Sequence, residues 1–81
     1  MVNMDKKAIR IAKIIEKECL QSGTCIVIEG ENTYRYIIMC KDMKFSIIAS
    51  RTQLEVLNNF QIVRYIIGEM KIYILEKYFK Y

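Results

Sequence analysis

The chain has 81 residues, of which 53% are hydrophobic and 27% are charged, and its formal net charge is +4. This composition indicates one small globular domain spanning residues 1–81 and excludes an intrinsically disordered chain. Histidine is absent, and the three cysteines, Cys19, Cys25 and Cys40, form no CxxC pair. The most common general base and metal ligand is therefore missing. We expect a protein that is not an enzyme and that uses no metal, other cofactor or small-molecule substrate.

Apolar runs such as Ile37–Cys40 are far too short to cross a bilayer. The first ten residues carry charges where a signal peptide has an apolar segment. An odd number of cysteines also differs from the paired thiols of secreted miniproteins. We therefore expect a cytoplasmic protein that does not associate with membranes.

The first segment, 4–21, is predicted to be an amphipathic helix that Asn3 caps and that Gly23 ends. Apolar residues recur along one side of it at steps of three and four: Met4, Ala8, Ile11, Ala12, Ile15 and Cys19. Cys19 lies on this apolar side, and Cys40 lies on the apolar side of a predicted strand described below. Both are expected to act as small core hydrophobes. Basic residues stack along the opposite side of the helix: Lys6, Arg10, Lys13 and Lys17.

Alternating, β-branched sequence then predicts three strands, at 24–29, 34–41 and 44–49. The first two are joined by a turn at 30–32. A two-residue loop at Asp42-Met43 would join the second and third. That loop pairs Cys40 with Phe45, Ile38 with Ile47 and Tyr36 with Ala49, and it places all six on one side of the sheet.

Ser50 and Gln53 have the spacing of a capping box, so a short helix is predicted at 51–58. The last third of the chain is compatible with two structures. Its dense Ile, Val and Tyr content, together with Gly68-Glu69 as a turn, favours a hairpin over 61–75. A helical stripe through the same region indicates a long terminal helix as the alternative: Phe60, Val63, Ile67, Met70, Ile74, Tyr78 and Tyr81.

The predicted fold class is α+β: an N-terminal helix, a three-stranded antiparallel meander, a short helix and a C-terminal β-hairpin, or a long helix in place of the hairpin. In the hairpin version, the second side of the sheet displays more apolar surface than a small monomer usually shows. We expect a homodimer to form through the residues of that side: Ile37, Met39, Ile48, Ile62 and Ile66.

The abundance of isoleucine, lysine and tyrosine and the absence of proline, histidine and tryptophan resemble the small orphan proteins of Sulfolobus-type crenarchaeal viruses and plasmids. AT-rich bacteria and their phages encode similar proteins. The archaeal resemblance implies a heat-stable viral protein that works inside the host cell.

The order of elements over 4–75 is also similar to the core of restriction-type and Holliday-junction nucleases. That family holds its metal with acidic residues on the second and third strands, where this chain has none, at 34–38 and 44–48. The resemblance therefore implies at most an inactive relative that binds nucleic acid. The opening order of helix, three strands and helix resembles the double-stranded-RNA-binding domain, whose basic cluster is reduced here to Arg51.

Two functions follow as hypotheses. The net positive charge and the helix face with Lys6, Arg10, Lys13 and Lys17 favour a nucleic-acid-associated accessory protein that contacts the DNA or RNA backbone. The alternative is a protein-interaction module, either a homo-oligomer or an inhibitor of a host factor, that uses the apolar sheet face. From the sequence, nucleic acid is the slightly preferred partner.

Overall fold

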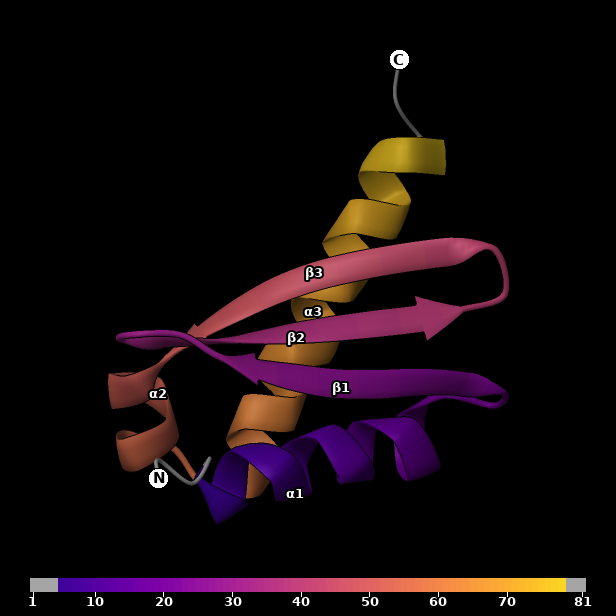
Figure 1. The fold of residues 1–81 in the computed structure, drawn as a ribbon. Coiled ribbons are helices and arrows are strands. Elements are labelled where there is room, and N and C mark those ends of the chain that lie inside the picture. The colour runs from indigo at the N-terminus through magenta and orange to yellow at the C-terminus, as the bar shows by residue number, and fades with distance from the viewer. Residues whose placement is uncertain (1–4, 79–81) are drawn as a thin grey trace.

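The computed structural model describes residues 5–78, which form an α+β fold with helices packed on one side of an antiparallel sheet (Figure 1). The strands follow one another in chain order, β1-β2-β3. The elements are α1 (Lys6–Ile14), the π-helical turn η1 (Ile15–Cys19), β1 (Gly23–Glu29), β2 (Thr33–Cys40), β3 (Met43–Ser50), α2 (Arg51–Val56) and α3 (Asn59–Tyr78). The predicted fold class is confirmed.

Asp5 caps α1, because its side chain accepts a hydrogen bond of 2.8 Å from the amide of Lys7. The predicted cap, Asn3, lies outside the described residues. The helix is continued by η1 and stops at Cys19, before Gly23, which begins β1 instead of ending the helix. A Cβ at Gly23 would lie 2.6 Å from the carbonyl oxygen of Met39. Glycine is therefore required here by the close approach of β2.

The two hairpins place the predicted residues on the predicted side of the sheet, but the second register differs from the prediction by two residues. Its loop is Lys41-Asp42, and Cys40 pairs with Met43, Ile38 with Phe45, Tyr36 with Ile47 and Tyr34 with Ala49. A shift of two preserves the side on which every residue lies, so the apolar alternation cannot distinguish the two registers. Lys41 takes the positive φ of 56° that the turn requires.

The capping box at α2 is confirmed, since the side chains of Ser50 and Gln53 bond each other's backbone amides. At the other end of α2, the ammonium group of Lys7 donates to the carbonyls of Leu54 and Leu57. A cation at a helix C-terminus satisfies carbonyls that have no partner within the helix. Lys7 therefore joins the start of α1 to the end of α2.

The predicted C-terminal hairpin is wrong, because α3 runs as one helix from Asn59 to Tyr78. Gly68 lies inside this helix and forms no turn. Ile62, Ile66 and Met70, spaced by four, are buried beneath α3 in the core. Burial of this stripe against the sheet outweighs the β propensity of the segment.

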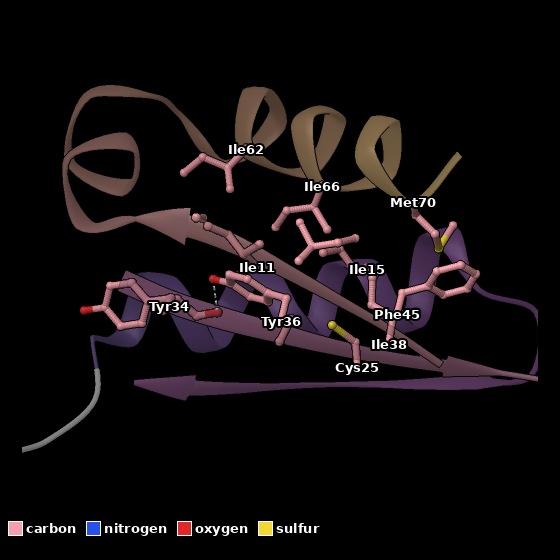
Figure 2. Close-up of a cluster of buried hydrophobic side chains, with 14 of the residues drawn as sticks. Ile11, Ile15, Cys25, Tyr34, Tyr36, Ile38, Phe45, Ile62, Ile66 and Met70 are labelled. Atoms are coloured by element: carbon pink, nitrogen blue, oxygen red, sulfur yellow. Dashed lines mark hydrogen bonds between the residues drawn. The ribbon is translucent and has the colours of Figure 1, made fainter. Parts of the chain in front are cut away.

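The core lies between the sheet and the helices (Figure 2). Tyr34 and Tyr36 are completely buried in it. The hydroxyl of Tyr36 donates a 3.0 Å hydrogen bond to the carbonyl of Ala8, which links β2 to α1. The other buried residues are apolar: Ala8, Ile11, Ala12, Ile15, Leu20, Cys25, Ile38, Phe45, Ile47, Ala49, Leu54, Ile62, Ile66 and Met70.

Candidate interaction surfaces

The side of the sheet opposite the helices is apolar and faces solvent. Five side chains make up this surface, which we name the open face: Ile26, Ile28, Ile37, Met39 and Ile48. Ile26 and Ile28 are 51% and 50% exposed, and Met39 and Ile48 are 43% and 45% exposed. In the register, Ile26 lies beside Ile37, and Arg35 separates Ile28 from Ile48. The five therefore form one patch across all three strands.

The charged residues that the strands place on the open face are both basic. Arg35 lies in the centre of it, and its guanidinium donates a 2.9 Å hydrogen bond to the hydroxyl of Ser46. Lys44 stands beside Met39 at one end. The open face thus combines aliphatic surface with positive charge.

Three of the five predicted interface residues, Ile37, Met39 and Ile48, lie on the open face. The other two do not, because Ile62 and Ile66 belong to α3 and are 1% and 0% exposed in the core. Their assignment to the interface is a consequence of the incorrect hairpin.

Sequence reasoning missed Ile26 and Ile28, although the alternation within 24–29 contained the signal. Cys25 is buried and Val27 is partly buried on the helix side. Their neighbours must therefore point to the other side of the pleated strand.

The predicted basic residues of the first helix are all exposed: Lys6, Arg10, Lys13 and Lys17. The first three border a shallow depression on α1 together with Ile9 and Ile14. Lys17 belongs to η1. We name these four residues the basic ridge. Asp5 and Glu18 stand near its two ends as exposed acids.

The thiols lie in three different environments. Cys25 is buried and Cys40 partly so, but Cys19 is exposed, contrary to the prediction that it packs in the core. The π turn explains the difference, because its period brings the fifth residue, not the fourth, back to the same side. Leu20, five residues after Ile15, is accordingly buried in the position expected for Cys19.

Burial raises the pKa of the Cys25 thiol to about 12, with smaller contributions from Glu16 and Cys19. At neutral pH this thiol is protonated and therefore a poor nucleophile and metal ligand. Within residues 5–78, no three cysteine, aspartate or glutamate side chains gather closely enough to hold a metal ion.

Arg51 holds the β1–β2 turn against the start of α2. Its guanidinium donates to the hydroxyl of Tyr34 at 3.0 Å, and it forms an ion pair of 3.3 Å with Glu29. It also lies over the ring of Tyr34, 5.1 Å from the centroid. These contacts engage the guanidinium of Arg51 within the fold. Arg51 therefore has a structural role in this fold.

A groove of about 1150 Å³ lies between the beginning of β3 and the end of α3. It is lined by Asp42, Met43, Lys44, Phe45, Ser46, Tyr73, Leu75, Glu76 and Lys77. The rings of Phe45 and Tyr73 contact each other there, with centroids 6.5 Å apart and planes tilted by 38°. Half of the surface of Tyr73 and of Leu75 is exposed there.

None of the helices in the described part of the chain is both long enough and apolar enough to span a membrane. Comparisons with models of protein families, with curated proteins and with solved structures found no match for this chain.

Proposed function

We propose that this protein is a non-enzymatic interaction module that binds another protein through its open face. The observation that carries the proposal is the exposure of Ile26, Ile28, Met39 and Ile48 on one continuous surface, each at between 43% and 51%. Contiguous apolar surface of this kind is typical of protein-binding sites. The slight preference for nucleic acid that the sequence alone suggested is therefore reversed.

The charges on the open face define the partner further. Arg35 and Lys44 are the charged residues that the three strands place on the open face, because Glu29 of β1 lies on the helix side with Cys25 and Val27. Stacking two copies of the open face would bring like charges together, which is unfavourable. The expected partner is a different protein, with an apolar surface bordered by aspartate or glutamate.

A titration with designed peptides tests this proposal. The probe is an amphipathic helical peptide with leucine on one side and glutamate along the border, and the control peptide has lysine in place of glutamate. We expect the glutamate peptide to shift the amide resonances of β1, β2 and β3 selectively. The lysine peptide should bind at least about tenfold more weakly, because a lost charge pairing of 1–2 kcal/mol has that effect.

Two variants locate the binding surface. Ile28→Ser and Arg35→Glu should each weaken binding of the glutamate peptide. Ile9→Ser removes an exposed isoleucine of α1, away from the open face, and should leave binding unchanged. Equal binding by all three variants, or perturbed resonances confined to the helices, would refute the proposal.

A second candidate function is supported by the basic ridge, which presents four exposed cations over about 16 Å of helix. If it binds duplex DNA or RNA through four phosphates, the slope of log K against log salt concentration should be about −3.6. Binding would then weaken roughly 150-fold between 50 and 200 mM salt.

Fluorescence anisotropy with a labelled duplex and a single strand checks this candidate. Replacing Lys6, Arg10, Lys13 and Lys17 with glutamine should abolish the salt-dependent binding. Replacing the exposed cations of α3, Arg64, Lys71 and Lys77, is the matched control and should have little effect. The absence of binding at 50 mM salt would exclude nucleic acid as the partner.

A further inference from the structure

The two outer strands of the sheet differ in how their edges are protected. On β1, the carboxylate of Glu16 accepts a 2.9 Å hydrogen bond from the amide of Cys25, so η1 covers the middle of that edge. On β3, the hydroxyl of Tyr65 donates a 3.3 Å hydrogen bond to the carbonyl of Ile48, near the end of the strand. Tyr65 therefore covers the β3 edge only at Ile48.

The position of the Tyr65 bond shows which residues of β3 direct their peptide groups outward. Ile48 has its carbonyl on the outer edge, and residues in an antiparallel strand alternate between the two edges. Lys44 and Ser46 therefore also direct their N–H and C=O groups outward. Both residues line the groove beside α3. An uncovered edge of this kind is a template for another strand.

The end of α3 forms the other wall of the groove. In Figure 1 α3 passes behind the sheet, and its yellow end continues beyond β3. The two apolar side chains of α3 that line the groove are half exposed, Tyr73 at 50% and Leu75 at 54%. The groove thus combines a strand edge with an adjacent apolar surface.

We infer that a second copy of this chain occupies the groove, with the two β3 strands paired antiparallel about a twofold axis at Phe45. This register places Lys44 opposite Ser46 of the second copy, and it keeps the two Lys44 side chains from facing each other. Four backbone hydrogen bonds can form between the outward peptide groups of these residues. The part of the β3 edge at Ile48, which Tyr65 covers, forms no hydrogen bonds to the second copy.

The charges that line the groove balance, which allows a second copy of the chain to approach it. The groove contains two acids, Asp42 and Glu76, and two bases, Lys44 and Lys77. With equal numbers of acids and bases, two copies can meet at the groove without an excess of like charge. The twofold symmetry brings both Phe45–Tyr73 pairs together at the axis, where the exposed halves of Tyr73 and Leu75 become buried.

The resulting sheet has six strands, and the open faces of the two copies lie side by side on it. This inference concerns a different surface from the one used in the proposed function. Either can fail without the other, because the groove and the open face are changed by different substitutions.

Ser46→Pro is the most direct test, with sedimentation equilibrium as the measurement. Proline removes the outward N–H of residue 46 but no hydrogen bond to β2, and edge strands tolerate proline in that orientation. We expect the dimer to weaken about 25-fold, because each copy loses one hydrogen bond and each bond is worth about a fivefold change. Ser46→Ala loses the same hydroxyl but keeps the N–H, and it should dimerise like the wild type.

Two further measurements identify the surface even if Ser46→Pro does not fold. Leu75→Glu should weaken the dimer, whereas Val56→Glu, which changes the 75% exposed side chain of α2, should not. In hydrogen exchange of the wild type, the amides of Lys44 and Ser46 should become protected as the protein concentration is raised. A wild type that stays monomeric at millimolar concentration, or a dimer in which these two amides exchange freely, would overturn the inference.

Discussion

Tyr36 carries a hydroxyl group into the core and uses it to connect two elements. Its side chain is completely buried, and its hydroxyl donates to the carbonyl of Ala8 at 3.0 Å. A buried hydroxyl without a partner costs free energy, so the bond is needed once the tyrosine is buried. The bond fixes the position of α1 along β2.

Tyr36→Phe should lower the free energy of unfolding by about 1 kcal/mol, because it removes this hydrogen bond and leaves the ring in place. Urea denaturation measures the change. Tyr65→Phe is the control, since its 3.3 Å bond to Ile48 lies at an exposed position and should contribute less. If the two variants lose the same free energy of unfolding, burial does not make the Tyr36 bond more stabilising than the exposed Tyr65 bond.

The stability of the protein should fall as the solution becomes alkaline, because of Cys25. Its pKa is about 12 in the folded chain and about 9.0 in the unfolded chain, so between these values only the unfolded chain releases the proton. The folded state is favoured fully below pH 9, and the free energy of unfolding decreases as the pH rises above it. The slope reaches at most about 1.4 kcal/mol per pH unit.

Urea denaturation at pH 8, 9 and 10 measures this slope. Cys25→Ala lowers the stability at every pH, but it should flatten the decline between pH 9 and 10. At higher pH, Tyr36 adds a second decline, since burial also raises the pKa of its hydroxyl. An unchanged slope in Cys25→Ala would show that other groups cause the decline.

At the scale of elements, α3 is the part of the fold that the sequence leaves ambiguous. Gly68 distinguishes the two possibilities experimentally. In the helix it lies at an interior position, and a Cβ there would meet no atom within 4 Å. In a hairpin, the same residue would occupy a turn position that favours glycine.

Gly68→Ala should therefore raise the free energy of unfolding by about 0.5–1 kcal/mol, because alanine has the higher helix propensity. Thermal and urea denaturation measure it. Gly23→Ala should lower the free energy of unfolding, since its Cβ would collide with the carbonyl of Met39. Destabilisation by Gly68→Ala would argue against a continuous α3.

The sequence predicts the side of the sheet on which a residue lies better than it predicts the residue's partner. Alternation placed Ile37, Met39 and Ile48 on the open face correctly, although the hairpin register was shifted by two. It could not exclude a hairpin at 61–75, because isoleucine and tyrosine there satisfy both a period of two and a period near four. Packing against the rest of the fold decides between them, and one segment read alone does not contain that information.

The surfaces differ in how far the sequence alone predicts them. The basic ridge was predictable, since four cations opposite an apolar stripe must face solvent. Ile62 and Ile66 were misplaced because their assignment depended on an incorrect element. The groove could not be predicted, because it forms only where β3 and α3, distant in sequence, lie side by side.

The molecule as a whole is elongated, with principal extents of 45, 24 and 22 Å. We expect the local stability to differ between the middle of the molecule and the end of α3. β2 is paired on both sides, whereas the part of α3 that follows Met70 carries mostly exposed side chains. Regions with few buried contacts open at a lower free energy.

Hydrogen exchange under dilute conditions should therefore be slowest in β2 and fastest, among the helices, in α3 beyond residue 71. The comparison is made within one experiment, so intrinsic exchange rates can be divided out. Uniform protection along α3 at low concentration would indicate that its end is held by contacts other than those of the groove.

The order in which the core is assembled during protein synthesis has a consequence of its own. The three strands and α1 leave the ribosome before α3, which supplies Ile62, Ile66 and Met70 to the core. At 5–20 residues per second, making residues 51–78 takes roughly one to six seconds. During that interval the nascent meander has apolar side chains on both sides, because α3 does not yet cover the helix side and the open face has no cover even in the finished fold. Translation speed through the codons of α3 thus determines how long the unfinished chain is exposed to aggregation and to chaperones.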